Sequence, residues 1–202
     1  MATSLTGVFG GTFDPPHLGH LILASEALSQ LGLERLLWVL TPDPPHKPSQ
    51  PITPLSQRLE MLRLALSDEP RFEICEIEID RPGPHYTVET LRQLKAANPA
   101  TELVYLMGGD SLRDLPSWRN PAEIIRQCRA LGVMRRPYDA VDLATLEKIL
   151  PGISAKVRFV DVPLLEIASS QVRQRVAANQ SFRYYLHPRV YDYILETGLY
   201  RS

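Results

Sequence analysis

The stretch GVFGGTFDPPHLGHLILASEAL, residues 7–28, leads from an apolar run through a glycine turn into a segment of helical period. Residues 5–9 are expected to form a buried strand and residues 20–31 a helix. Glycine lets a backbone turn tightly and approach a ligand closely, and free N–H groups at a helix N-terminus favour an anion. The stretch therefore predicts a phosphate-binding loop, in which His17 and His20 project from the first helical turn. Their imidazoles could donate hydrogen bonds to phosphate oxygens or, as imidazolium, add positive charge.

Two other interpretations of this loop compete with phosphate binding. A pair of histidines could hold a metal ion, but no third ligand stands nearby in the sequence. The loop could also be a plain glycine turn with one buried and one exposed histidine. Neither GxxxxGK[ST] nor GxGxxG follows the first strand, so a nucleotide would be held by a different device from those two phosphate loops.

Composition limits the class of protein. The chain has 202 residues, a net charge of −1, 44% hydrophobic residues and 22% charged residues, which is ordinary for a soluble globular protein. The small net charge argues against a large nucleic-acid footprint. Two cysteines without a CxxC pattern fit a reducing cytoplasm. Neither a signal peptide nor 18 consecutive apolar residues can be identified, so we expect a cytoplasmic protein without a membrane span.

Short apolar runs alternate with helical patterns along the whole chain. This order predicts an α/β protein with a Rossmann-like, mostly parallel sheet, helices on both faces and a small C-terminal helical part. Residues 72–79 alternate, but their apolar phase changes midway, which suggests a bulge or an edge strand. We expect one domain over 1–202, with the helical segment 165–202 packed on it and a long proline-rich loop at 42–54. The expected strands are 5–9, 36–40, 72–79, 103–107, 130–134 and 157–162, and the expected helices are 20–31, 56–66, 88–97, 122–128, 143–150, a short one from 170, and 188–196.

Ligands of such sheets bind beyond the carboxyl ends of the strands, so the loops after strands are the candidate sites. In IASSQVRQR, residues 167–175, Ser169 or Ser170 could cap a helix whose free N–H groups and Arg173 would form a second anion site. The alternative is an ordinary capped surface helix. In GGDSLRDLPSW, residues 108–118, Gly108 permits close approach and Asp110 can accept hydrogen bonds from ribose hydroxyls, unless the turn merely begins a helix.

Three further segments carry residues suited to a nucleotide. Tyr86 and Thr87 would stand at a helix N-terminus, where N–H and hydroxyl donors could receive a carboxylate and discriminate acid from amide; an ordinary threonine cap is the alternative. His46 and Lys47 lie on a proline-stiffened loop and could contact a phosphate, although a solvated lysine is the usual case. After the expected strand 130–134, Arg135 or Arg136 could lie on an adenine face.

The segment GGTFDPPHLGH resembles the GGTFDPxHxGH signature of the HxGH nucleotidyltransferases. The remaining motifs resemble the bacterial nicotinate-nucleotide adenylyltransferases over nearly the whole length: PPHKP at 44–48, RLEML at 58–62, YTVETL at 86–91, MGGDSLRDLPSW at 107–118, SSQVRQRV at 169–176 and VYDYILETGLY at 190–200. The chain departs from the family pattern at His85 and Ala168, where serine is usual, and at Tyr138, where glycine is usual.

The resemblance implies a role for each matching position. His17, His20 and Arg173 would be catalytic, and Mg²⁺ would be carried by the ATP phosphates without a metal site of the protein. Trp118 would stack on the nicotinate ring. Nicotinate mononucleotide would be bound by Asp14, His46, Lys47, Tyr86, Thr87 and Trp118. ATP would be bound by Gly10, Gly11, Thr12, Phe13, His20, Gly108, Asp110, Arg135, Ile167, Ser169, Ser170 and Arg173.

The expected reaction is attack by the 5′-phosphate of nicotinate mononucleotide on the α-phosphorus of ATP, which yields nicotinic acid adenine dinucleotide (deamido-NAD) and pyrophosphate. Because the acceptor is itself the nucleophile, no activated serine or cysteine is needed. Phosphopantetheine or nicotinamide mononucleotide are alternative acceptors. A catalytic half of an aminoacyl-tRNA synthetase and a non-catalytic nucleotide-binding protein are alternatives from other classes. The partners expected are small molecules, with neither nucleic acid nor membrane; the oligomeric state stays open, a homo-oligomer included.

Overall fold

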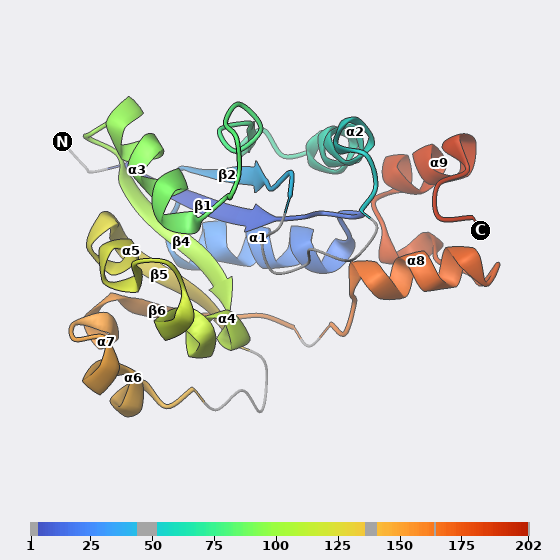
Figure 1. The fold of residues 1–202 in the computed structure, drawn as a ribbon. Helices are drawn as coiled ribbons and strands as arrows, with labels where there is room; N and C mark the ends of the chain where they lie inside the picture. Colours follow the sequence, from blue (N-terminus) through green and yellow to red (C-terminus); the bar gives the residue numbers. More distant parts are fainter. Residues whose placement is uncertain (1–3, 44–51, 136–140, 164, 202) are drawn as a thin grey trace.

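The computed structural model describes residues 4–43, 52–135, 141–163 and 165–201. Six strands of this part of the chain pair in parallel in the order β3-β2-β1-β4-β5-β6 (Figure 1). Chain order reverses between β1 and β4, and in open α/β sheets ligands bind at this switch point. The strands are β1 (Leu5–Gly11), β2 (Arg35–Leu40), β3 (Phe72–Cys75), β4 (Glu102–Gly108), β5 (Cys128–Arg135) and β6 (Val157–Asp161).

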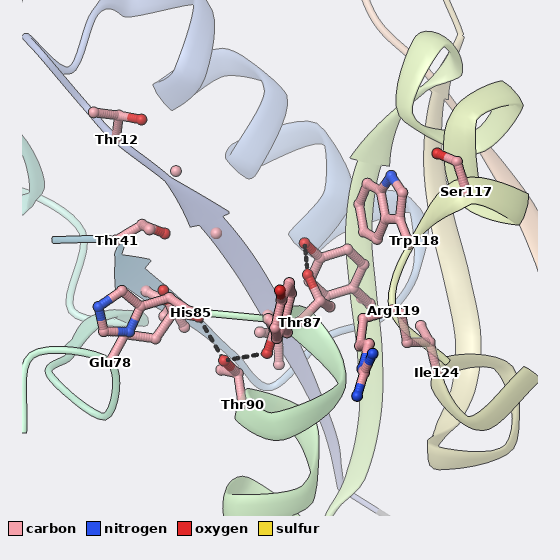
Figure 2. A pocket seen from close by; sticks show the side chains of 16 residues that line it. Thr12, Thr41, Glu78, His85, Thr87, Thr90, Ser117, Trp118, Arg119 and Ile124 are labelled. Atoms are coloured by element: carbon pink, nitrogen blue, oxygen red, sulfur yellow. Dashed lines mark hydrogen bonds between the residues drawn. The ribbon is translucent and has the colours of Figure 1, made fainter. Parts of the chain in front are cut away.

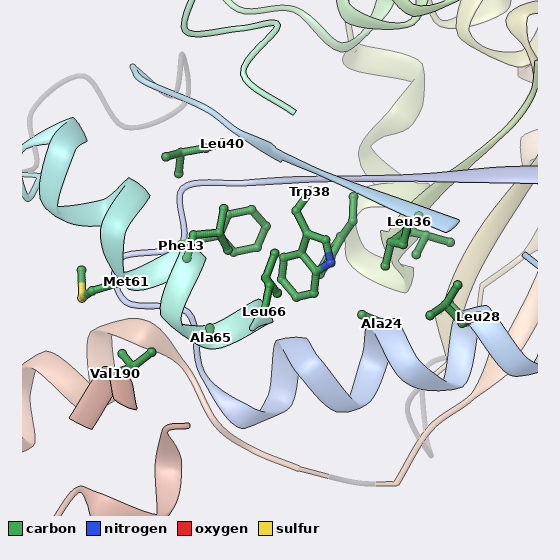
Figure 3. Packing of buried hydrophobic residues seen from close by; sticks show 14 of the residues in the cluster. Phe13, Ala24, Leu28, Leu36, Trp38, Leu40, Met61, Ala65, Leu66 and Val190 are labelled. Carbon is green, nitrogen blue, oxygen red and sulfur yellow. The ribbon is translucent and has the colours of Figure 1, made fainter. Parts of the chain in front are cut away.

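Each face of the sheet has its own hydrophobic core, because side chains along a strand point alternately to the two faces. On one face, Phe9 and Trp38 pack with helices α1 (Leu18–Gln30) and α2 (Leu55–Leu66). On the other, Val8 and Tyr105 pack with α3 (Thr87–Ala97), α4 (Gly109–Asp114), α5 (Pro121–Gln127), α6 (Leu143–Ile149) and α7 (Ile153–Lys156). Figure 3 shows the fully buried Trp38 indole among the side chains of the first core.

The C-terminal segment joins the first of these cores. Helices α8 (Ser169–Ala177) and α9 (Pro188–Thr197), with a short 3-10 turn at Arg183–Tyr185 between them, bury Val172, Val176, Val190 and Ile194 in the core that also contains Trp38. Helix α9 lies against α2 (Figure 1). The two C-terminal helices therefore share one hydrophobic core with α1 and α2.

The predicted fold class is confirmed, and the differences from the predicted elements are local. Strand β3 pairs with β2 alone and ends at Cys75, so it is an edge strand without a bulge. The apolar phase changes because the chain turns after Cys75, where Ile79 and Asp80 donate backbone hydrogen bonds to the carbonyl of Glu76. Helices α4 and α7 were not predicted, because they span only six and four residues. Most of the proline-rich segment lies outside the described residues.

None of the helices in the described ranges has the length and apolar character needed to cross a bilayer.

Candidate active site

Two cavities open at the carboxyl ends of β1 and β4, one on each side of the sheet. Adjacent residues of β1 divide between them: Gly10 lines the first cavity and Phe9 the second. The first has a volume of about 310 Å³ and contains Trp118, and we call it the Trp118 cavity. The second has a volume of about 550 Å³ and contains both histidines of the β1–α1 loop, and we call it the His20 cavity. The switch point of the sheet thus provides two adjacent binding spaces.

The N-terminus of α1 is closed by a reciprocal pair of histidines. Nδ1 of His17 accepts a hydrogen bond from the backbone N–H of His20 (3.3 Å), and Nδ1 of His20 accepts one from the backbone N–H of His17 (3.2 Å). The rings stack with centroids 3.6 Å apart and planes 22° apart. Both residues line the His20 cavity. This arrangement has the form of a capping box, with imidazoles in place of the usual Ser/Thr and Glu/Gln side chains.

The hydrogen bonds fix which ring nitrogen carries the proton. Because each Nδ1 is an acceptor, a neutral ring must hold its proton on Nε2, which then is a donor. Burial lowers the pKa of His17 to about 4. Burial, together with the charge of His17, lowers the pKa of His20 well below its ordinary value. In the free protein both imidazoles are therefore neutral at pH 7, and the expectation that they add positive charge as imidazolium does not hold there.

The residues around the histidine pair explain the loop sequence. A Cβ on Gly19 would lie 3.0 Å from Nδ1 of His17, so glycine gives the ring room to lie over the helix. Phe13 adopts a left-handed backbone conformation, with φ of 45°, and its buried ring meets the ring of His20 edge-on at 5.2 Å. Phe13 was predicted in the ATP site, but its ring lines neither cavity and supports His20 from the core.

The N-terminus of α8 forms the opposite wall of the His20 cavity. Ile167, Ser169, Ser170 and Arg173, which were predicted to bind ATP, all line this cavity. The expectation that a serine caps the helix is wrong: the N-cap is Ala168, and the Ser169 hydroxyl donates to the carbonyl of Pro15 (2.8 Å). Nη1 of Arg173 donates to the carbonyl of Asp14 (2.6 Å). Within the described residues its Nε and Nη2 have no partner, so they are available to an anion.

The loop after β4 completes this cavity. Gly108 and Asp110 line it, and open space faces the Cα of Gly108. The Asp110 carboxylate is exposed and pairs with Arg113. Arg135 is the last residue of β5, which ends beside this site, but its side chain is outside the described part of the structure. The ribose and adenine contacts expected of Asp110 and Arg135 stay predictions; the residues themselves lie at the carboxyl ends of neighbouring strands.

The Trp118 cavity brings together Tyr86, Thr87 and Trp118, three of the six residues predicted to bind nicotinate mononucleotide (Figure 2). Tyr86 is the N-cap of α3 and Thr87 its first residue. The Thr87 hydroxyl lies 3.3 Å from the hydroxyl of Tyr105, whose pKa burial raises to about 12. The ring of Trp118 meets that of Tyr105 edge-on at 6.2 Å and faces the cavity. An apolar wall, neutral hydroxyl donors and a helix N-terminus suit an aromatic carboxylate.

The other predicted site residues fall into three groups. Gly10, Gly11 and Thr12, expected to bind ATP, line the Trp118 cavity. The buried Asp14 carboxylate accepts from the Tyr200 hydroxyl (2.7 Å) and the backbone N–H of Thr53 (3.2 Å), and it lines neither cavity. The predicted contacts by His46 and Lys47 lie outside the described residues.

Other cavity residues were missed from the sequence. Glu78, His85, Tyr105 and Arg119 line the Trp118 cavity. Glu78 lies where the sequence predicted a strand, and Tyr105 is inside an apolar strand, so neither pattern marked a site. Arg119 lies over the ring of Tyr86, with Cζ 6.0 Å from the ring centroid. The position of Arg119 directly after Trp118 in a polar loop could have identified it as a site residue.

No group of three or more His, Cys, Asp or Glu side chains in the described ranges is arranged to hold a metal ion.

Residues 8–175 match the family model described as Cytidylyltransferase-like. The chain is 46% identical over 199 residues to the probable nicotinate-nucleotide adenylyltransferase of Thermomicrobium roseum, and the match covers 98% of this chain and 92% of the relative. The chain belongs to the nicotinate-nucleotide adenylyltransferase family. A probable nicotinate-nucleotide adenylyltransferase of Roseiflexus castenholzii is 42% identical over 201 residues, with 100% of both chains covered.

Membership in the adenylyltransferase family agrees with the fold. The structure of a Plasmodium falciparum nicotinic acid mononucleotide adenylyltransferase complexed with NaAD superposes with a TM-score of 0.81 and 20% identity, covering 98% of this chain and 97% of that chain. At this identity the likeness establishes the shared fold.

Proposed function

We propose that the chain transfers the adenylyl group of ATP to nicotinate mononucleotide, with ATP in the His20 cavity and the mononucleotide in the Trp118 cavity. The observation that carries this assignment is the division of the two cavities by β1. One side holds imidazole donors and two helix N-termini suited to phosphates, and the other holds an aromatic wall with a helix N-terminus suited to a carboxylate. In the deamido-NAD product, the adenosine half would lie in the His20 cavity and the nicotinate half in the Trp118 cavity.

The His20 cavity supplies a charge-stabilising surface for a triphosphate. Amides at the N-termini of α1 and α8 favour anions, and Nε2–H of both histidines and the open guanidinium edge of Arg173 are further donors. Mg²⁺ bound to the ATP phosphates would neutralise part of their charge.

The Trp118 cavity favours the acid over the amide. The N-terminus of α3 and the Thr87 hydroxyl provide donors, and Arg119 provides a positive charge at the rim of the cavity. Within the described residues Arg119 forms neither an ion pair nor a side-chain hydrogen bond, so its guanidinium is available to a carboxylate. An amide group would direct its own N–H donors at these donors and lose the charge interaction.

The reaction proposed is a direct displacement. A 5′-phosphate oxygen of the mononucleotide forms a bond to the α-phosphorus of ATP while the bond from that phosphorus to the bridging oxygen breaks, and pyrophosphate leaves with the electron pair. Neither a protein nucleophile nor a proton transfer is needed. The protein positions the two substrates and stabilises the charge that develops on the phosphate oxygens, through His17, His20, Arg173 and helix amides.

A panel of acceptors tests the assignment. Pyrophosphate release from Mg-ATP is measured with nicotinate mononucleotide, nicotinamide mononucleotide, phosphopantetheine or no acceptor. The proposal expects the highest kcat/KM with nicotinate mononucleotide. Release with phosphopantetheine alone, a preference for the amide, or no release with any acceptor would each reject it.

A further inference from the structure

A buried polar cluster lies on the wall of the Trp118 cavity that is opposite Trp118 (Figure 2). Glu78 is 5% exposed and His85 is 6% exposed, and both line the cavity. Oε1 of Glu78 accepts a hydrogen bond from the Thr90 hydroxyl and lies 3.7 Å from Nη2 of Arg81. The cluster therefore ties the segment after β3 to the first turns of α3.

Three polar atoms of this cluster lack a partner: Nε of Arg81, and two atoms of side chains that line the cavity. Oε2 of Glu78 and Nδ1 of His85 are buried, and within the described residues neither forms a hydrogen bond. A buried unpaired acceptor costs free energy unless a ligand or an ordered water satisfies it. Because both side chains line the same cavity, the missing partners would enter from that cavity. The ligand must therefore present a hydroxyl or N–H donor to Glu78, and a hydroxyl would suit His85 whether its Nδ1 accepts or donates.

The order of groups in a mononucleotide indicates which part reaches this wall. In the proposed pose the ring lies between Trp118 and the α3 N-terminus, and the 5′-phosphate lies toward the loop after β1, where Thr12 lines the cavity. The ribose joins the two groups, and it carries two hydroxyls. In Figure 2 the cluster lies below Thr12 and Thr41 and across the cavity from Trp118, the side left for the sugar.

We propose that Glu78 and His85 form the ribose subsite of the acceptor nucleotide, an inference that rests on the proposed function. Oε2 of Glu78 accepts a hydrogen bond from one ribose hydroxyl, and the imidazole of His85 forms a hydrogen bond with the other ribose hydroxyl. A carboxylate suits this place because it only accepts hydrogen bonds and a vicinal diol donates two. The positive charge of the pyridinium ring, attached to the same sugar, adds to the attraction of Glu78.

Acceptor analogues that lack one hydroxyl test this subsite. The kcat/KM values of nicotinate mononucleotide and its 2′-deoxy and 3′-deoxy analogues are measured with the wild type, Glu78→Gln and His85→Ser. Loss of a hydrogen bond to a carboxylate is expected to lower the wild-type kcat/KM by about 10-fold or more for at least one analogue. In Glu78→Gln the same analogue should be at most about 3-fold worse than the full substrate, because the charged acceptor is already gone.

Two controls separate recognition from folding. Glu76→Gln makes the same change at an exposed position two residues away, outside the cavity lining, and should retain the wild-type response to the analogues. Thr90→Val removes the hydroxyl bound to Oε1 but leaves Oε2, so it should retain the hydroxyl dependence even if its overall activity falls.

The outcomes discriminate among the possibilities. If the wild type uses nicotinate mononucleotide and both deoxy analogues equally well, the subsite is wrong while the proposed function stands. If Glu78→Gln lowers kcat/KM by the same factor for all three acceptors, the cluster only supports α3, and the proposal is also overturned. Failure of the wild type to use nicotinate mononucleotide at all would overturn the proposed function and this inference together.

Discussion

The rings of His17 and His20 hold each other in place: each Nδ1 accepts a hydrogen bond from the other residue's backbone N–H, and the ring centroids are 3.6 Å apart. The arrangement fixes both rings before any substrate binds, with Nε2 as the donor on each. Preorganised donors of this kind need no rearrangement as charge develops in the transition state.

Removal of one donor should therefore affect the chemical step. His20→Ala is expected to lower kcat by on the order of 10²-fold or more, as for other transition-state donors. Steady-state kinetics with saturating ATP and nicotinate mononucleotide measure this effect. A change confined to KM would contradict a role in transition-state stabilisation.

The neutral state of the pair predicts a pH dependence of stability. Because burial lowers the pKa of His17 from 6.5 to about 4, the unfolded chain binds more protons than the folded chain between these values. His17 therefore does not reduce the stability of the folded state above pH 6.5. As the pH falls from 6.5 to 4, protonation of the unfolded chain lowers the free energy of unfolding by on the order of 3 kcal/mol. Urea unfolding from pH 7 to pH 4 measures it, and His17→Gln should flatten the curve. Imidazole NMR signals assigned to His17 and His20 that titrate near pH 6.5 in the folded protein would contradict the prediction.

Gly19 is predicted to be needed for the position of the His17 ring. A Cβ at this residue would lie 3.0 Å from Nδ1 and 3.1 Å from Cε1 of His17, so Gly19→Ala should displace the ring. We expect a fall in kcat of about 10-fold or more with a smaller effect on stability, because alanine favours a helix over glycine. Ser25→Ala, at an exposed position of the same helix, is the matched control and should leave kcat unchanged. Wild-type kcat in Gly19→Ala would show that the ring can move without loss.

Arg58 is predicted to hold two loops of the site together, the one after β1 and the one between β2 and α2. Its guanidinium is buried and donates to the carbonyls of Thr12 (3.1 Å), Thr41 (2.8 Å), Pro42 (2.7 Å) and Thr53 (2.9 Å). Arg58→Gln would leave several partly buried carbonyls without a donor and should lower the free energy of unfolding by about 3 kcal/mol or more.

Another arginine of the same helix provides the control for that measurement. Arg63 is 53% exposed and pairs with Glu60 and Glu76 at the surface, so Arg63→Gln should cost under about 0.5 kcal/mol. The two variants are compared by thermal and urea unfolding. Equal stabilities of Arg58→Gln and Arg63→Gln would refute the proposed role of Arg58 as a link between loops.

The sequence predicts the fold and the location of the site because both depend on local pattern. Apolar runs such as 36–40 and the helical spacing after them indicate a parallel α/β sheet, and the glycines that follow the expected strands 5–9 and 103–107 indicate where a ligand binds. The GGTFDPPHLGH and YTVETL segments then indicate the kind of ligand.

Long-range contacts explain what the sequence does not reveal. The Tyr200 hydroxyl contacts Asp14 across 186 positions, and Arg58 contacts Thr12 across 46. No periodicity encodes such pairs, so Asp14 was expected to bind substrate while its carboxylate is held within the protein. Glu78 was missed for a similar reason, because its alternating context resembles a strand and its burial depends on the packing of α3.

The most direct test of the account is a crystal structure of the protein with deamido-NAD, because the two halves of this product must lie in the two cavities. We predict the nicotinate ring against Trp118, with its carboxylate at Thr87 and Arg119, and the adenosine half in the His20 cavity near Asp110. Adenine in the Trp118 cavity, or both halves on one side of β1, would contradict the account.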